Sequence, residues 1–253
     1  MTKRYSLIVV YNKELDKSPT YKLCREYNNL ITIVCDNSTT PNNNQNIAKK
    51  DGVIYISMNG NKGLSCAYNA GINEIQSKNG YIMIMDDDTE IPRTYIEWFL
   101  SAGLHDTDIY LPIVKDEKGI MSPSKNVKGV VYRSQDTNIS YSEITGINSG
   151  MIINLSCFKD FSYDEKLFLD YVDHYFLIEM KKRNKKIKVL PFEIYQNFSA
   201  NTNSKKSAIV RWNIFKRDSK YFYRNNKKNY FFILLKRRIR LMLQYKDLTF
   251  LWR

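Results

Sequence analysis

Short apolar runs alternate with helix-like stretches along the first hundred residues. The apolar runs, rich in β-branched side chains, are residues 5–11, 31–35, 53–57 and 81–85. The stretches with helical spacing between them are residues 21–28, 44–50 and 65–77. Such a repeat predicts buried parallel strands joined by crossover helices. In sheets of this kind ligands collect at the carboxyl ends of the strands, so the polar residues after each strand are the candidates for function.

The pattern becomes mixed after Pro92. The expected elements are a helix over 94–102, strand-like pieces punctuated by Gly119, Gly129, Gly146 and Gly150, a helix from near Asp173 to Asn184, a strand over 187–190 closed by Pro191, and two basic, aromatic-rich helices from about 207 onward. Glycine and proline mark the boundaries between these pieces. The chain is therefore predicted to be an α/β protein with a mixed, mostly parallel central sheet, flanking helices and a C-terminal helical extension.

Composition is that of a folded protein with an excess of positive charge. Of 253 residues, 43% are hydrophobic and 26% are charged, which excludes a disordered chain. The formal net charge is +13, and its Lys and Arg residues concentrate after Lys181 while acids become scarce. A basic tail favours anionic partners such as phospholipid, nucleic acid or a diphosphate-linked substrate, although a solvated helix face would look the same.

Cysteine usage and hydropathy predict a protein of the reducing cytoplasm. Cys24, Cys35, Cys66 and Cys157 show no C-x-x-C spacing and suit core positions better than disulfides or metal ligands. No stretch approaches the roughly 20 apolar residues of a membrane-spanning helix, and the apolar run at the N-terminus is too short for a signal peptide. The expected location is the cytoplasm, with peripheral contact at the inner face of the plasma membrane as an option.

Three consecutive acids, Asp86, Asp87 and Asp88, directly follow the apolar run 81–85. Carboxylates at i and i+2 of an extended segment project to the same side, and paired carboxylates suit a hard divalent cation that binds a diphosphate. An acidic triplet alone is weak evidence, because a solvated loop often contains one. Its place at a strand end makes a functional role more credible.

The other strand ends are polar too. The first run ends in Tyr11 and Asn12, the second is followed by Asp36, and the third by Asn61 and Gly63. These residue types are ordinary turn formers. An acid can also accept hydrogen bonds from a base or ribose, however, and glycine allows backbone to approach a ligand closely.

The ordered set of these motifs resembles family 2 glycosyltransferases, and within them bacterial rhamnosyltransferase-like enzymes. The resemblance rests on Val9-Val10-Tyr11-Asn12, Asp36-Asn37-Ser38, the series Asn61, Gly63, Ala67, Asn69 and Gly71, and Met85-Asp86-Asp87-Asp88-Thr89. It is good over residues 5–92 and patchier to about 217. It implies a GT-A-like (Rossmann-like) fold and inverting sugar transfer from dTDP-rhamnose or a UDP-hexose to a lipid-linked or oligosaccharide acceptor in surface polysaccharide synthesis.

The resemblance also implies roles for individual residues. The donor nucleotide would be bound by Tyr11, Asn12, Asp36, Asn61, Gly63, Asn69, Asp86, Asp87, Arg211 and Arg217. Asp36 would contact the base, and Asp86 and Asp88 would form the D-x-D pair that binds Mg²⁺ or Mn²⁺, with Asp88 the more direct ligand. Residues 1–205 would be the catalytic domain, with 1–92 as the nucleotide-sugar-binding half and 93–205 as the acceptor half, and 206–253 the extension.

Two segments of the second half supply the predicted acceptor site. Ser149 and Gly150 resemble the family's S-G strand beside the acceptor, and 168–173 (FLDYVD) resembles its "F-I-D-x-V-D" segment. This places Asp173 as the catalytic base, which removes the proton of the attacking hydroxyl. A helix N-cap is the alternative for Asp173, and Asp170, expected to contact the acceptor, is the reserve candidate for the base.

The chain departs from the family pattern at two places. Gln196-Asn197 stands where a metal-binding His is often found, so Gln196 is either a weaker oxygen ligand or no ligand. The basic segment from Arg211 to Arg217 ends in Asp218 rather than Asn, so its arginines either hold the diphosphate or coat a helix. Neighbours on a helix point in different directions, so His174 is not expected to act with Asp173.

Other classes of function explain fewer residues. A nucleic-acid-binding protein would use the basic tail, but acids at the mouth of its sheet would repel phosphate, so no nucleic acid is expected. A nucleotidyltransferase would usually carry a glycine-rich loop after the first strand, where this chain reads Tyr-Asn-Lys-Glu. Apolar residues at helical spacing among the Lys and Arg of the tail predict either an interfacial helix or a face that packs on the catalytic domain or another subunit, and an oligomer is possible.

Overall fold

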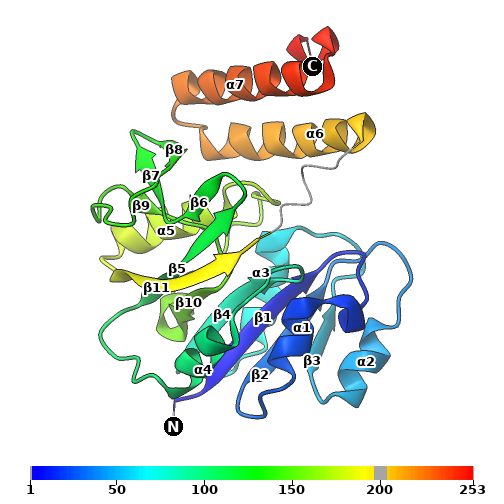
Figure 1. The fold of residues 1–253 in the computed structure, drawn as a ribbon, viewed down its shortest axis with the longest axis vertical. Coiled ribbons are helices and arrows are strands. Elements are labelled where there is room, and N and C mark those ends of the chain that lie inside the picture. The colour runs from blue at the N-terminus through cyan, green and yellow to red at the C-terminus, as the bar shows by residue number, and fades with distance from the viewer. Residues whose placement is uncertain (1, 197–203, 253) are drawn as a thin grey trace.

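The computed structural model describes residues 2–196 and 204–252. Its main sheet has eight strands in the order β11-β5-β10-β4-β1-β2-β3, with β6 paired to β5 (Figure 1). Strands β1, β2, β3 and β4 are parallel, whereas β10 runs antiparallel between β4 and β5. The predicted mixed, mostly parallel sheet is confirmed.

The first half builds the parallel part of this sheet. Its strands are β1 (Arg4–Val10), β2 (Ile31–Asp36), β3 (Ile54–Ser57) and β4 (Tyr81–Asp86), and its helices are η1 (Leu15–Lys17), α1 (Pro19–Cys24), α2 (Asn44–Lys50) and α3 (Leu64–Asn73). Alternate side chains of β1 enter the two cores: Leu7 packs on the side of α3 and α5, and Ile8 on the side of α1, α2 and α4. The strand register pairs Val10 with Asp36 and Val9 with Asp86, so the polar strand ends meet at one edge.

The helix expected over residues 21–28 begins and ends earlier than predicted. Ser18 caps it by accepting a hydrogen bond from the backbone N–H of Tyr21, and Pro19 occupies its first turn. Both residue types favour a helix start at these positions. The helix expected over 65–77 likewise ends at Asn73.

The second half adds the antiparallel part. Its elements are α4 (Arg93–Ser101), β5 (Ile109–Asp116), β6 (Gly119–Ser122), β7 (Ser124–Val127), β8 (Val130–Arg133), β9 (Ile144–Thr145), β10 (Met151–Asn154), η2 (Leu155–Phe158), α5 (Val172–Lys182) and β11 (Ile187–Tyr195). Strands β7, β8 and β9 form a separate small sheet. The prediction that Pro191 closes the last strand is wrong: β11 continues to Tyr195, with a shift of register between Val189 and Glu193. An edge strand tolerates proline because its outer N–H groups have no ladder partner.

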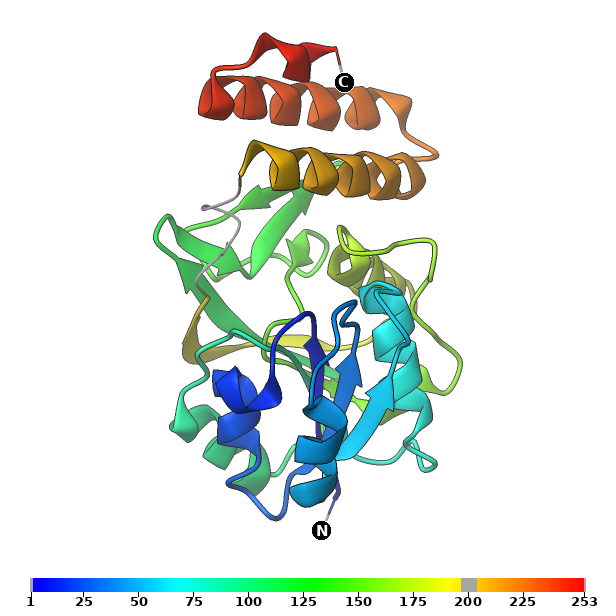
Figure 2. The ribbon, with the colours of Figure 1, turned by 90° about the vertical axis from the view of Figure 1, so that its right-hand side faces the viewer.

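Two long helices form a layer beyond the carboxyl end of the sheet (Figures 1 and 2). They are α6 (Lys205–Phe222) and α7 (Lys227–Tyr245), followed by the short η4 (Leu248–Leu251). Trp212, Phe215, Leu234, Leu241 and Phe250 give this layer a small core of its own. Within the described part of the chain, no helix is long and apolar enough to cross a membrane.

Candidate functional site

The acid triplet lies at the end of β4, as its place after an apolar run requires. Asp86 is partly buried, and its Oδ2 accepts hydrogen bonds from Ser149 Oγ (2.5 Å) and Gln196 Nε2 (3.0 Å). Burial, followed by the charge of Asp87, raises the pKa of Asp86. Burial and the neighbouring acids likewise raise the pKa of Asp88 to about 6. The end of β4 therefore carries three carboxyl groups whose charges act on one another.

Asp87 has a different set of partners from those of Asp86. Its carboxylate accepts a hydrogen bond from Lys13 Nζ (2.9 Å) and another from the backbone N–H of Tyr11 (3.3 Å). Thr20 Oγ1 donates to the backbone oxygens of Asp86 (2.8 Å) or Thr89 (2.9 Å), which fixes the acidic turn against α1. Sequence reasoning missed Lys13 and Thr20, because their partners are 66 to 74 residues away along the chain.

The oxygen atoms at this strand end fit a divalent cation. Asp86 takes neutral hydrogen-bond donors, and of the three acids Asp87 alone has an ion pair within the described residues. Asp86 and Asp88 both have raised pKa values, and neither has an ion pair within the described residues, so together they form a hard oxygen donor set. No cluster of three His, Cys, Asp or Glu side chains capable of holding a metal occurs in residues 2–196 and 204–252, so a cation here would need further oxygens from water or substrate.

Gln196 is hydrogen-bonded rather than free to ligate. Its Nε2 donates to Asp86, and its Oε1 lies 3.2 Å from Ser149 Oγ. The side chain thus orients Asp86 at the position where a metal-binding His is often found in the family. Asn197, the other residue of that segment, lies outside the described residues.

The predicted nucleotide-binding residues of the first two strand ends form one connected group. Asn12 Oδ1 accepts from the backbone N–H of Thr39 (2.8 Å), and the backbone N–H of Asn12 donates to Ser38 Oγ (2.9 Å). Asp36 accepts hydrogen bonds from Tyr55 OH (2.9 Å) and from Asn44 Nδ2 (2.8 Å). Burial acts to raise the pKa of Asp36, but its hydrogen bonds outweigh burial and the pKa lies below its usual value. Tyr11 is exposed beside this group.

Gly63 and Asn61 shape the turn into α3. Asn61 Oδ1 accepts from the backbone N–H of Gly63 (3.0 Å). Gly63 has φ of 86°, and a Cβ there would lie 2.5 Å from Phe168 Cδ2. The backbone N–H of Leu64 donates to the carbonyl of Phe168 (2.6 Å), so this glycine lets the loop before α5 pack on the start of α3. The contact between this turn and the loop before α5 is thus a structural reason for Asn61 and Gly63 at their positions.

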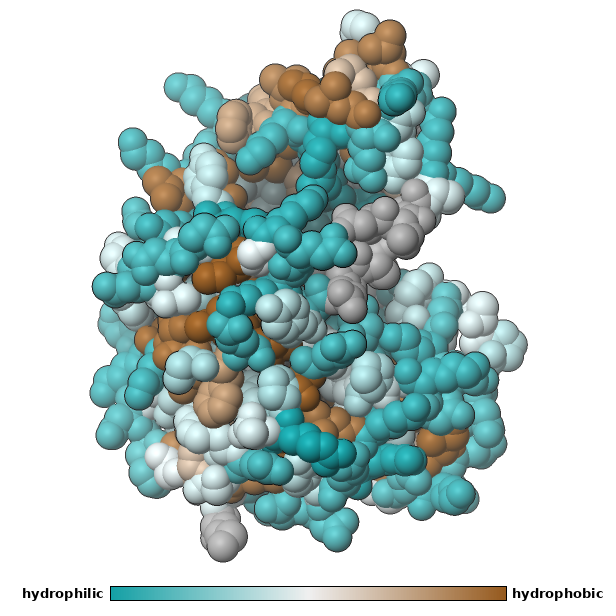
Figure 3. All heavy atoms as spheres, viewed as in Figure 1, coloured by the Kyte–Doolittle hydropathy of each residue, from teal (hydrophilic) through white to brown (hydrophobic). Residues whose placement is uncertain are grey.

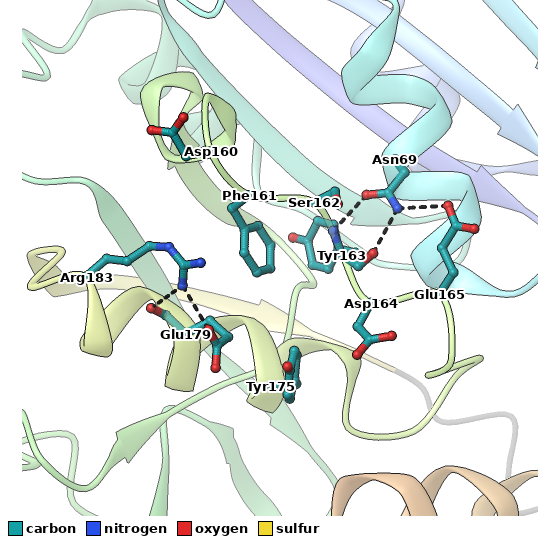
Figure 4. Close-up of a pocket in the computed structure, with 10 residues that line it drawn as sticks. All are labelled: Asn69, Asp160, Phe161, Ser162, Tyr163, Asp164, Glu165, Tyr175, Glu179 and Arg183. Carbon is teal, nitrogen blue, oxygen red and sulfur yellow. Dashed lines mark hydrogen bonds and ion pairs between the residues drawn. The ribbon is translucent and has the colours of Figure 1, made fainter.

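The side chain of Asn69 binds the loop 160–165 and not the acid triplet. Its side chain bonds both the N–H of Tyr163 (2.8 Å) and the carbonyl of Tyr163 (2.9 Å), and also Glu165 (3.0 Å). Figure 4 shows it at the wall of a cavity of about 480 Å³ that lies between α3, α5 and the loop 160–165. None of the three strand-end acids lines that cavity. The structure thus does not bring Asn69 together with the other predicted donor residues.

Asp173 lies in the first turn of α5, and the N-cap alternative for it is wrong. The N-cap is Tyr171, which has φ of 66° and contributes no capping side-chain hydrogen bond. Asp173 is partly buried, and its Oδ2 accepts from the backbone N–H of Asn148 (3.2 Å). Burial, then the charge of Asp86, raises the pKa of Asp173 to about 7. A carboxylate with a pKa near 7 is suited to accept a proton at neutral pH.

His174 faces away from this carboxylate. Its Nδ1 lies 2.8 Å from Thr145 Oγ1, and burial lowers its pKa to about 4, so the ring is neutral. The expectation that it does not act with Asp173 agrees with this contact.

The predicted acceptor residues have structural partners as well. Ser149 donates to Asp86, while a Cβ on Gly150, which has φ of 77°, would lie 2.4 Å from Ile194 Cδ1. Asp170 is paired with Arg211, whose Nη2 is 2.7 Å from Asp170 Oδ1. Arg217 lies over the ring of Phe168 (4.7 Å) and bonds Asp218. Of the two arginines, Arg211 thus reaches the loop that leads into α5, and Arg217 stacks beside it.

Comparison with known proteins identifies the family. Residues 7–168, more than half of the chain, match Glycosyl transferase family 2. The chain belongs to this family. A search of curated proteins finds no match.

Solved structures of low sequence identity share the fold. The mannosyltransferase PcManGT from Pyrobaculum calidifontis, in complex with GDP-Man and Mn²⁺, is 10% identical with a TM-score of 0.58 over 88% of this chain. TarS from S. aureus is 15% identical with a TM-score of 0.52 over 86% of this chain. The chain covers 64% and 39%, respectively, of these proteins. These likenesses concern the fold, and the predicted GT-A-like fold is confirmed.

Proposed function

We propose that this family 2 member is an inverting glycosyltransferase, which moves a sugar from a nucleotide diphosphate sugar to a saccharide acceptor. The observation that carries the proposal is that two consecutive residues bind the two acids: the backbone N–H of Asn148 donates to Asp173 (3.2 Å), and Ser149 Oγ donates to Asp86 (2.5 Å). A proton acceptor and an acid pair that can hold a cation against the diphosphate are the two parts that such a transfer needs.

In the proposed reaction the acceptor hydroxyl oxygen attacks the anomeric carbon as the bond to the nucleoside diphosphate breaks. Asp173 takes the proton of that hydroxyl, and the departing diphosphate carries the bonding electrons away. The backbone N–H of Asn148 holds Asp173 Oδ2 in place (3.2 Å), which leaves the other carboxylate oxygen for the hydroxyl. Attack opposite the leaving group inverts the anomeric carbon.

A divalent cation is part of the proposal. Asp86 and Asp88 would hold Mg²⁺ or Mn²⁺, and the bound ion would supply positive charge to the diphosphate of the donor. The mannosyltransferase of similar fold carries Mn²⁺ together with its GDP-Man. Ser149 and Gln196 orient the carboxylate of Asp86 for this role.

The proposed donors are dTDP-rhamnose and UDP-hexoses, and the proposed pathway is bacterial surface polysaccharide synthesis. The support is the resemblance of residues 168–173 to the rhamnosyltransferase segment. Residues 1–205 would form the catalytic domain. A donor-hydrolysis screen of purified nucleotide sugars with Mg²⁺ or Mn²⁺ tests the proposal, and turnover of one sugar nucleotide is expected. Cleavage of a nucleoside triphosphate with a sugar phosphate instead would identify a nucleotidyltransferase and overturn it.

Peripheral contact with the inner face of the plasma membrane is the last part of the proposal. Phe231, Leu235, Ile239 and Leu243 are exposed along one side of α7, and apolar side chains gather at this end of the molecule (Figure 3). Residues 227–246 contain seven Lys or Arg and no acid. An apolar stripe among cations suits the interface of an anionic bilayer.

A further inference from the structure

Two arginines from different helices converge on one carboxylate beside the proposed active site. Arg211 of α6 makes two hydrogen bonds to Asp170, and Arg237 Nη1 of α7 lies 3.9 Å from Asp170 Oδ1. All three side chains are partly buried, with exposed fractions of 32%, 18% and 14% for Arg211, Arg237 and Asp170. Two partly buried guanidinium groups thus share one carboxylate.

Asp218, an acid of α6 that acts on Arg211, has other partners. Asp218 Oδ2 accepts the backbone N–H groups of Leu169 (2.8 Å) and Asp170 (2.9 Å), and its Oδ1 pairs with Arg217 (3.1 Å). Its carboxylate is therefore engaged by the loop and by Arg217.

Arg237 retains unused hydrogen-bonding capacity. Its Nε is buried and has no hydrogen-bond partner among the described residues, while its guanidinium carbon lies 4.0 Å from the centre of the Phe215 ring. Burial, the main cause, lowers the pKa of Arg237 to about 10, and the charges of Arg211 and Arg240 act in the same direction. A partly buried cation with incomplete pairing is costly, so a further anion beside Arg237 would be stabilised.

We propose that Arg211 and Arg237 form a binding site for a phosphate group, and that Asp170 occupies this site when no ligand is bound. Two guanidinium groups match the tetrahedral oxygens of a phosphate, which offers more acceptors than one carboxylate. The site lies in the loop that leads into α5, near enough that the charge of Asp170 contributes to the raised pKa of Asp173. The C-terminal helix α7 then takes part in substrate binding.

The phosphate has two possible sources, the diphosphate of the sugar donor and the diphosphate of a lipid-linked acceptor. The choice between these two sources rests on the proposed function, but the prediction that the site binds an anion does not. Inorganic pyrophosphate is therefore the first probe, measured by calorimetry on the full chain in EDTA, where Asp86 and Asp88 hold no cation and repel the anion. Pyrophosphate binding in this test is therefore independent of whether the protein transfers a sugar.

Arg237→Gln should weaken pyrophosphate binding about tenfold, the effect of losing one charge-assisted hydrogen bond. Arg238→Gln is the matched control. Its Nε is also buried without a partner among the described residues, but Arg238 has no ion pair with Asp170 and lies over Trp212 (5.8 Å), so this variant should bind pyrophosphate as the wild type does. Asp170→Asn should tighten binding by removing the competing carboxylate. Thermal melting confirms that each variant is folded. Equal affinities in the wild type and Arg237→Gln would overturn the proposal, as would no binding by the wild type.

Substrate measurements then identify the source. If the donor supplies the phosphate, Arg237→Gln should weaken UDP or dTDP binding and raise the donor KM with every acceptor. If the acceptor supplies it, the donor KM should stay constant and the KM should rise for a lipid diphosphate acceptor but not for a phosphate-free oligosaccharide. Loss of activity with unchanged pyrophosphate affinity would count against the site rather than against the transferase function.

Discussion

At the scale of single residues, burial and neighbouring charge decide what Asp173 does. If it is the base, Asp173→Asn should lower kcat by a factor of about 10² to 10⁴ and leave donor affinity nearly unchanged, because the carboxylate acts on the acceptor in the transition state. Steady-state kinetics and nucleotide calorimetry measure the two effects. Full activity of Asp173→Asn with an inactive Asp170→Asn would transfer the role to Asp170.

The pKa of Asp173, raised to about 7, fixes the direction of two pH effects. Below this pH the carboxyl is protonated and cannot accept a proton, so kcat/KM should rise with pH through about 7. The unfolded chain loses this proton near pH 4, whereas the folded protein retains it up to about 7. Stability should therefore fall between those values as pH rises, and Asp173→Asn should melt at a higher temperature than the wild type at pH 8. A lower melting temperature would contradict the raised pKa.

Within the described residues Asp87 has an ion pair, with Lys13, and Asp88 has none, and this difference yields a further prediction. Asp88→Asn should abolish metal-dependent nucleotide binding with the fold intact, because an amide is a poorer ligand for a hard cation. Asp87→Asn is the matched control and should be milder, since Asp87 is held by Lys13. Calorimetry with and without Mn²⁺ compares the two, and unchanged metal dependence in Asp88→Asn would remove Asp88 from the site.

At the scale of elements, the loop before α5 is held between α3 and α6. Gly63→Ala should destabilise the protein by several kcal/mol, because its Cβ would lie 2.5 Å from Phe168 and its φ is positive. Gly52→Ala is the control: its φ is also positive, but nothing lies within 4 Å, so it should cost only about 1 kcal/mol. Urea unfolding measures both. Equal costs would show that the packing of loop and helix contributes nothing beyond backbone strain.

At the scale of the whole molecule, the helical layer has an exposed apolar side on α7. Leu235→Ser with Leu243→Ser should reduce binding to vesicles rich in anionic lipid, because both side chains are more than half exposed on α7. Val210→Ser, an equally exposed position on α6, is the control. Vesicle flotation measures binding, and raised salt should weaken it. Wild-type flotation by the double variant would mean that this face serves another purpose.

The sequence by itself determined the parallel sheet and the edge where its polar strand ends meet. Apolar runs followed by Asp36 and by Asp86 are local patterns, and parallel pairing brings strand ends together whatever the rest of the chain does. Only the tertiary structure decided which side chains pair across long sequence separations. Lys13 pairs with Asp87 and Arg237 with Asp170 because distant segments of the chain pack together. Strand β11 continues past Pro191 because it lies at the edge of the sheet. Neither cause leaves a periodic signal in the sequence.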